Sequence, residues 1–82
     1  MMEVSLYQII NRLQAMKHDQ SDDVQIRSFS LFGIELCQVS YSHITGIYTI
    51  EVYASQQHFE FDNLDLTAIE IYELLTDLQK IF

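Results

Sequence analysis

The segment CQVSYSHITGIYTIEVY, residues 37–53, contains the pattern that decides the fold. Apolar and polar side chains alternate on both sides of Gly46, as is typical of strands with one buried face. The apolar members are Cys37, Val39, Tyr41, Tyr48, Ile50 and Val52. Gly46 adopts a positive φ easily, which favours a tight reversal. The segment therefore predicts an antiparallel hairpin of two strands, residues 34–41 and 47–54.

Two further alternating runs flank this hairpin. From Val24 the apolar Phe29 and Leu31 alternate with serines, and Gly33 separates this run from the next. After a predicted turn at residues 55–57, residues 58–61 form a short run with Phe59 and Phe61 inward. Because the connections are short, consecutive strands are expected to pair in a four-stranded antiparallel meander. Its other face is expected to show Gln38, Ser40, Thr49, Glu51, Tyr53, His58 and Glu60.

Helical periodicity appears at both ends of the chain. Residues 5–17 place apolar side chains at helical spacing, and Ser5 with Gln8 matches a capping box. Asn63 or Asp65 can cap a second helix that runs to about Lys80. The predicted fold is α+β: helix, four-stranded antiparallel meander, helix, with both helices packed on one sheet face. We expect one domain over residues 1–82.

The second helix is unusually apolar. Its apolar arc covers about 240° of the helical wheel, whereas packing on one surface needs a stripe of about 100°. The helix is therefore expected to touch two surfaces, its own sheet and either the first helix or a second copy of the chain. The residues predicted to mediate self-association are Leu74, Leu78, Ile81 and Phe82.

Composition limits the function. The chain has 82 residues, and a domain of this size forms only a marginal core, so oligomerisation is the favoured way to gain burial. One cysteine allows no intramolecular disulfide and no four-cysteine zinc site. The net charge of −8 disfavours nucleic acid and anionic membranes, and favours a basic partner or a cation. No apolar run could cross a membrane and no signal peptide is visible, which predicts a cytoplasmic protein.

The residues with chemical potential have plain structural interpretations. Cys37 lies within a strand and far from any lysine or arginine, so we interpret it as a core residue. The histidines at 18, 43 and 58 lack metal-site spacing and are interpreted as solvent-exposed. The oxygens of Asp62, Asn63 and Asp65 suit a strand-to-helix turn, since the EF-hand ligand positions are not filled. We predict no catalytic residue, no cofactor and no metal, although a weak Mg²⁺ or Ca²⁺ site is left open.

One segment resembles a known family. FDNLDLTAIEIYELL, residues 61–75, is similar to the C-terminal signature of the YkuJ-like family, which comprises small bacterial proteins of uncharacterised function. Three shorter pieces agree in the same order: residues 12–14, 37–41 and 51–53. The resemblance implies an antiparallel sheet flanked by terminal helices. It implies no activity and no catalytic residue.

Two functions follow as hypotheses. The first is a non-catalytic, homo-oligomeric interaction module, expected to be a dimer, that holds a protein partner on its acidic surface or open sheet face. The alternative is a small-molecule or divalent-cation binding protein, with minor catalysis left open and a site between the sheet and the second helix. The contacts predicted for that site are Tyr41, Tyr53, His58 and Asp62.

Overall fold

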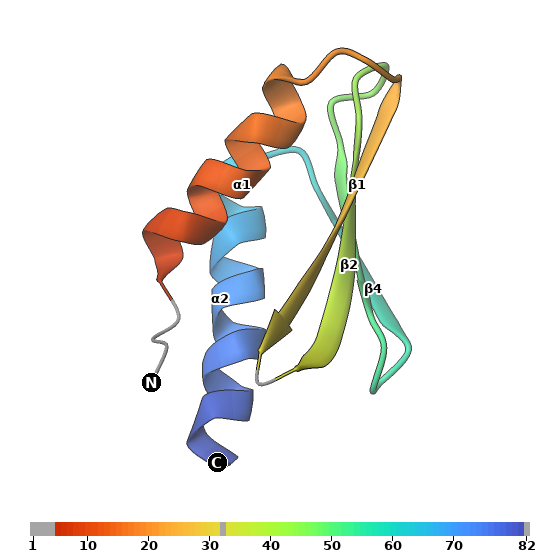
Figure 1. The fold of residues 1–82 in the computed structure, drawn as a ribbon. Helices are drawn as coiled ribbons and strands as arrows, with labels where there is room; N and C mark the ends of the chain where they lie inside the picture. Colours follow the sequence, from red (N-terminus) through yellow and green to blue (C-terminus); the bar gives the residue numbers. More distant parts are fainter. Residues whose placement is uncertain (1–4, 32, 82) are drawn as a thin grey trace.

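The structure, a computed structural model, describes residues 5–31 and 33–81, without the side chains of residues 31 and 78–81. Its elements are α1 (Leu6–His18), β1 (Val24–Leu31), β2 (Ile34–Ser42), β3 (Tyr48–Val52), β4 (Gln57–Phe61) and α2 (Leu64–Ile81). The strands form one antiparallel sheet in the order β1-β2-β3-β4. Both helices lie on the same side of this sheet (Figure 1). The predicted meander and the placement of both helices are confirmed.

The strand register explains the two faces of the sheet. On β2 and β3, Cys37 lies opposite Val52 and Val39 lies opposite Ile50, and all four side chains are buried. The residues between them point to the other side, where Gln38 pairs with Glu51. This matches the face predicted to be polar, which we call the open face: Gln38, Ser40, Thr49, Glu51, Tyr53, His58 and Glu60.

Side-chain caps begin both helices. The Ser5 hydroxyl accepts a hydrogen bond of 3.4 Å from the Gln8 N–H, and the Asn63 amide oxygen accepts one of 3.1 Å from the Leu66 N–H. Each cap satisfies one of the free N–H groups in the first turn of its helix. Ser5 therefore caps α1 as predicted, and of the two candidates for α2 it is Asn63 that caps.

The β3–β4 connection differs from the prediction. The third strand was expected over residues 47–54, but β3 ends at Val52 and a turn occupies residues 53–56. Gln56 has a φ of 56°, a left-handed conformation that non-glycine residues adopt uncommonly. The turn thus starts two residues earlier than predicted, and Gln56 takes the left-handed position that a glycine often fills. Gln57 already belongs to β4.

The core lies between the sheet and the helix pair. α2 contacts α1 and all four strands of the sheet. The two surfaces predicted for this helix are therefore its own sheet and the first helix. Fully buried side chains from every layer meet here, among them Leu13 and Met16 of α1, Ile50 of β3 and Ile71 of α2. On the outer side of α2, Leu66 and Ile69 remain about half exposed, at 52% and 45%.

The residues predicted for self-association lie along the second half of α2. Leu74 is half-buried and packs against the core of its own chain. Leu78 and Ile81 belong to the helix, but their side chains are outside the described part, and Phe82 lies outside the described residues. Self-association through these positions therefore remains a prediction. In the part of the chain described, neither helix is both long and apolar enough to cross a membrane.

Candidate functional site

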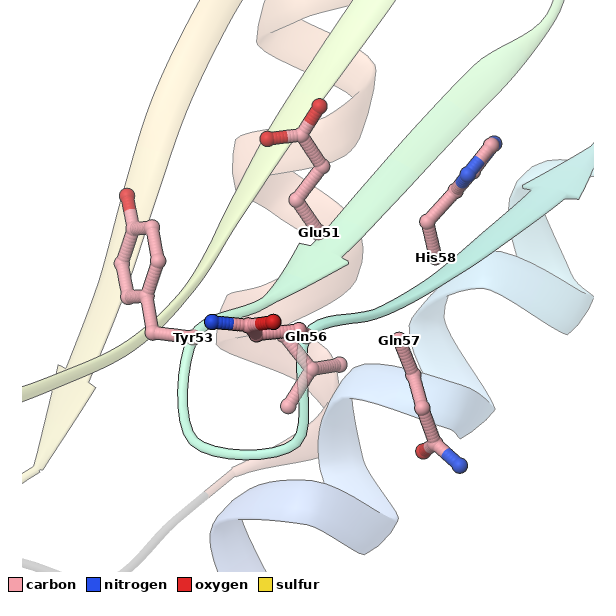
Figure 2. Close-up of a pocket in the computed structure, with 6 residues that line it drawn as sticks. Glu51, Tyr53, Gln56, Gln57 and His58 are labelled. Carbon is pink, nitrogen blue, oxygen red and sulfur yellow. The ribbon is translucent and has the colours of Figure 1, made fainter.

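A hollow of about 430 Å³ opens at the turn between β3 and β4. It is lined by Glu51, Val52, Tyr53, Gln56, Gln57 and His58. Figure 2 shows Glu51, Tyr53 and His58 in front of the sheet while the helices lie behind it, so these three side chains are on the open face. Gln57 extends in the opposite direction from His58. The volume falls within the range of small-ligand pockets, about 300–1,000 Å³.

Strand pairing places the two ionisable groups of the hollow. Glu51 on β3 lies directly opposite His58 on β4, so both side chains project from the same face of neighbouring strands. The His58 Nε2 also lies 3.8 Å from a carboxylate oxygen of Glu60. His58 thus has Glu51 as its cross-strand neighbour and the Glu60 carboxylate as its neighbour along β4, and about 60% of both the His58 and the Glu60 side chain is exposed to solvent.

Tyr53 forms another wall of the hollow. Its N–H donates a 3.1 Å hydrogen bond to the Leu36 carbonyl of β2, which holds the start of the turn against the sheet. Its hydroxyl donates a long hydrogen bond of 3.4 Å to the side-chain oxygen of Gln38. The ring is 41% exposed, so one face of it remains available beside the Glu51 carboxylate.

These groups are suited to binding a ligand. A carboxylate and an aromatic face together attract a cation, while the Gln56 and Gln57 amides can donate or accept hydrogen bonds. The chain's one thiol, on Cys37, is buried in the core, and this burial raises its pKa to about 11. A thiol with a raised pKa is a poor nucleophile at neutral pH. This agrees with the interpretation of Cys37 as a core residue.

Of the four contacts predicted for a ligand, the hollow brings together Tyr53 and His58. Tyr41 is on the other face of the sheet, buried with its ring centre 4.5 Å from that of Tyr48. Asp62 follows the opposite end of β4. The cavity therefore lies at the β3–β4 turn on the open face, and core side chains occupy the space between the sheet and α2. Sequence reasoning missed Gln56 and Gln57, because no periodicity or motif marks a glutamine in a turn as part of a binding site.

A second hollow, about 350 Å³, is lined by Gln20, Asp22, Asp23 and His43. Its histidine already has a structural role. The His43 Nε2 lies 2.7 Å from the Asp19 carbonyl oxygen, which can only accept, so Nε2 donates. The ring also packs edge-on against Tyr41 at 5.0 Å. The interpretation of His43 as solvent-exposed is therefore wrong, because the residue is half-buried and joins the hairpin to the α1–β1 loop.

That loop is organised around Asp19. Its carboxylate accepts hydrogen bonds from the Ser21 hydroxyl at 2.7 Å and the Ser21 N–H at 3.1 Å, and lies 3.7 Å from the Arg27 guanidinium. These hydrogen bonds, with a smaller contribution from Arg27, lower the pKa of Asp19. Both carboxylate oxygens thus have partners within the chain, so this cluster serves the loop more than a ligand.

Metal binding has little to support it in the described residues. They contain no group of three or more histidine, cysteine, aspartate or glutamate side chains arranged around a common point. Asp62 and Asn63 connect β4 to α2, which begins at Leu64, and the Asn63 carbonyl oxygen accepts a 2.8 Å hydrogen bond from the Thr67 hydroxyl. The structural interpretation of this segment holds for Asn63, whose side chain and carbonyl both serve the helix start.

The fold and the hollow define a class: a small α+β protein with helices on one sheet face and an open, polar face on the other. The chain matches the family model described as protein of unknown function DUF1797 over residues 9–75, and it belongs to this family. It is 31% identical to the uncharacterised protein YkuJ of Bacillus subtilis over 72 residues, which cover 82% of this chain and 91% of YkuJ.

The fold of this relative is also similar. An X-ray structure of YkuJ from Bacillus subtilis superimposes with a TM-score of 0.77 at 30% identity, covering 84% of this chain and 94% of that one. The resemblance to the YkuJ-like family is thereby confirmed.

Proposed function

We propose that the chain is a non-catalytic, homo-oligomeric interaction module that binds a basic segment of a protein partner on its open sheet face. The observation that carries this proposal is the hollow at the β3–β4 turn, where the Glu51 carboxylate stands beside the exposed ring of Tyr53. A lysine or arginine side chain would meet a carboxylate and an aromatic face together.

The charge distribution supports a basic occupant. Residues 28–79 contain no lysine or arginine, so no lysine or arginine of β2, β3 or β4 competes with a partner for Glu51 and Glu60. The net charge of −8 adds a long-range attraction for basic segments and repels nucleic-acid backbones and anionic lipids. A binding surface of this kind depends on charge and fit, and needs no reactive group.

The proposal can be tested with short peptides. Amide chemical shifts of the labelled protein are followed while a peptide of alternating arginine and threonine is added, with glutamate in place of arginine as the peptide control. We expect shifts centred on Glu51, Tyr53 and His58 with the basic peptide alone. Glu51→Gln is expected to weaken binding about fivefold or more, since it removes a charge-assisted contact.

A matched variant separates the site from net charge. Glu73→Gln removes the same charge from an exposed position on α2. It is expected to leave the affinity within about twofold, because salt screens the attraction between the peptide and a distant surface charge. If Glu73→Gln weakened binding as much as Glu51→Gln, or if no shifts appeared at the hollow, the proposed site would be abandoned.

The second candidate function is small-molecule binding, which the volume of the hollow favours. Native mass spectrometry of protein purified gently from its own host distinguishes the two functions. A retained adduct of small mass supports a metabolite in the hollow. A bare oligomer, or an oligomer with a second polypeptide, supports the interaction module. A divalent cation is tested separately, by a shift of the melting temperature with Mg²⁺, Ca²⁺ or EDTA.

A further inference from the structure

The two edge strands of the sheet differ in whether their outward backbone groups are already hydrogen-bonded, and this difference favours one edge for pairing with another chain. In a strand, the N–H and C=O of one residue point to the same side, and those of the next residue point to the other. Cross-strand contacts therefore reveal which residues of each edge strand present unpaired backbone groups. β1 and β4 are the two edges.

On β1 the outward groups belong to the even-numbered residues. The Ser42 N–H donates to the Ile47 carbonyl, so Ser42 faces β3 and the odd residues of β2 face β1. The His43 N–H donates to the Asp23 carbonyl, which agrees with that assignment. Because Gln25 pairs with Tyr41, the odd residues of β1 face β2. Ile26 and Ser28 therefore direct their N–H and C=O groups away from the sheet.

Two arginines occupy this edge. The Ser28 carbonyl accepts a 2.9 Å hydrogen bond from the Arg12 guanidinium, and the Ile26 carbonyl accepts a 2.8 Å bond from the Arg27 guanidinium. The Arg12 guanidinium also lies over the Phe29 ring, 4.2 Å from its centre. Charged side chains along an edge are a known protection against pairing with another chain. The β1 edge is thus protected against pairing with another strand.

On β4 the outward groups belong to His58 and Glu60. The Tyr53 N–H donates to the Leu36 carbonyl, so the odd residues of this part of the chain face β2 and the even residues of β3 face β4. Ile50 pairs with Phe59, so the N–H and C=O groups of Phe59 point toward β3. Among the residues described, no hydrogen bond from a side chain, turn or cap reaches the main chain of His58 or Glu60. The β4 edge is open.

We propose that two copies of the chain pair antiparallel through their β4 edges, in the register that sets His58 of one copy opposite Glu60 of the other. The outward N–H and C=O groups of these two residues then exchange hydrogen bonds across a two-fold axis at Phe59. Such an interface is self-complementary, as a symmetric dimer requires. This inference rests on the proposed function in one respect: it takes the chain to be homo-oligomeric and names the interface between its copies.

Charge selects the register. A two-fold axis perpendicular to the sheet keeps both open faces on the same side, so side chains of the two copies meet across the new strand pair. A shift centred on Glu60 would oppose two carboxylates, and a shift centred on His58 would oppose two imidazoles. The register centred on Phe59 places an imidazole against a carboxylate twice, repeating the His58–Glu60 approach seen within one chain.

Sedimentation velocity tests this dimer, from low-micromolar to sub-millimolar protein. Glu60→Pro removes an outward N–H without touching the β3–β4 ladder, since proline is tolerated where the N–H faces solvent. We expect it to raise the dimer dissociation constant about tenfold or more, because an edge hydrogen bond is lost and the ring blocks approach. Glu60→Gln keeps the N–H but loses the charge, and it is expected to weaken the dimer less than Glu60→Pro does. Ser28→Pro removes an outward N–H from the β1 edge instead, and this control variant is expected to remain dimeric.

A charge exchange tests the register. His58→Glu opposes like charges and is expected to abolish the dimer, while the double variant His58→Glu with Glu60→Lys is expected to restore it. Should a variant fold poorly, hydrogen exchange of the unmodified protein decides. The His58 and Glu60 amides are expected to become protected as concentration rises, while the Ile26 amide is not.

Several outcomes would overturn the β4 dimer. They are a monomer at all concentrations, a dimer that survives Glu60→Pro and His58→Glu, or amide protection that ignores concentration. Loss of the dimer in Leu78→Asp alone would instead locate the contact at the end of α2. Peptide binding is measured separately on the Glu60→Pro variant. Retained binding there, reduced by Glu51→Gln, leaves the open-face function intact whichever way the dimer test falls.

Discussion

The hydroxyl of Tyr48 donates a buried hydrogen bond of 3.1 Å to the carbonyl oxygen of Leu13. Tyr48 is the first residue of the inner strand β3 and Leu13 lies in the middle of α1, and the two residues are 2% and 0% exposed. The bond crosses the core from one layer to the other. It fixes where the first helix lies along the sheet, since apolar packing alone tolerates small displacements.

Tyr48→Phe is expected to lower the free energy of unfolding by about 1 kcal/mol, because a buried hydrogen bond is lost while the volume is kept. The loss stays modest because the Leu13 carbonyl retains its partner within α1. Urea denaturation measures it. Tyr53→Phe is the matched control, since its hydroxyl makes a long bond on the exposed face, and it should change stability by less than about 0.5 kcal/mol.

Alkaline pH should weaken the fold through the same residue. Burial, with a smaller contribution from Tyr41, raises the pKa of Tyr48 to about 12 from 10.0. The folded state binds the proton more tightly than the unfolded state does, so this stabilisation is complete below pH 10 and is lost as pH rises toward 12. Denaturation midpoints between pH 9 and 12 should fall less steeply in Tyr48→Phe than in the unmodified protein. Parallel curves would contradict this account.

The Cys37 thiol should resist modification in the folded protein. It is 0% exposed, and burial raises its pKa from 9.0 to about 11, so both access and thiolate formation are suppressed. We expect iodoacetamide to react at pH 8 far more slowly than with a free cysteine, and at the free rate once urea unfolds the chain. Fast labelling of the folded protein would mean that β2 opens locally.

Arg12→Met should destabilise the protein by about 1–2 kcal/mol, since it removes a charged hydrogen bond to the Ser28 carbonyl and the contact with the Phe29 ring. It should also raise light scattering during refolding, because one guard of the β1 edge is gone. Gln14→Met makes a similar change at an exposed position of the same helix and is expected to stay within about 0.5 kcal/mol. Equal losses in both would remove the special role of Arg12.

Asn63→Ala should cost about 1 kcal/mol through the lost cap of α2. Asp62→Ala, one residue earlier and exposed, is the comparison and should be nearly neutral. Thermal unfolding followed by circular dichroism at 222 nm measures both. If Asp62→Ala were the more damaging change, a carboxylate near the helix start would matter more than the amide that caps it.

Most of the fold could be predicted because alternation and turn spacing act locally. The apolar positions of β2 and β3 and the capping serine of α1 follow from nearest neighbours in sequence. The wide apolar arc of α2 was resolved only by the structure, where the helix contacts α1 as well as the sheet. Which side chains stay exposed on it, Leu66 and Ile69, depends on the angle at which the two helices meet.

The candidate site was predictable only in part. Alternation places Tyr53 and His58 on the open face, and the hollow includes both. Their meeting with Gln56 depends on a turn with a left-handed residue, which no local signal marks. Tyr41 was predicted as a contact of a site between the sheet and the second helix, but its own alternation places it in the core. His43 was misjudged because its partner, Asp19, is 24 residues away.

Of the two arginines on the β1 edge, Arg12 belongs to α1. The same helix therefore covers the core side of β1 and protects its outer edge. When α1 detaches from the sheet, the core side of β1 is uncovered and the Ser28 carbonyl loses its partner in the same event. Detachment of this one helix thus exposes both an apolar surface and the outer edge of β1 in a single step. We therefore expect aggregation of this protein to follow how often its first helix opens.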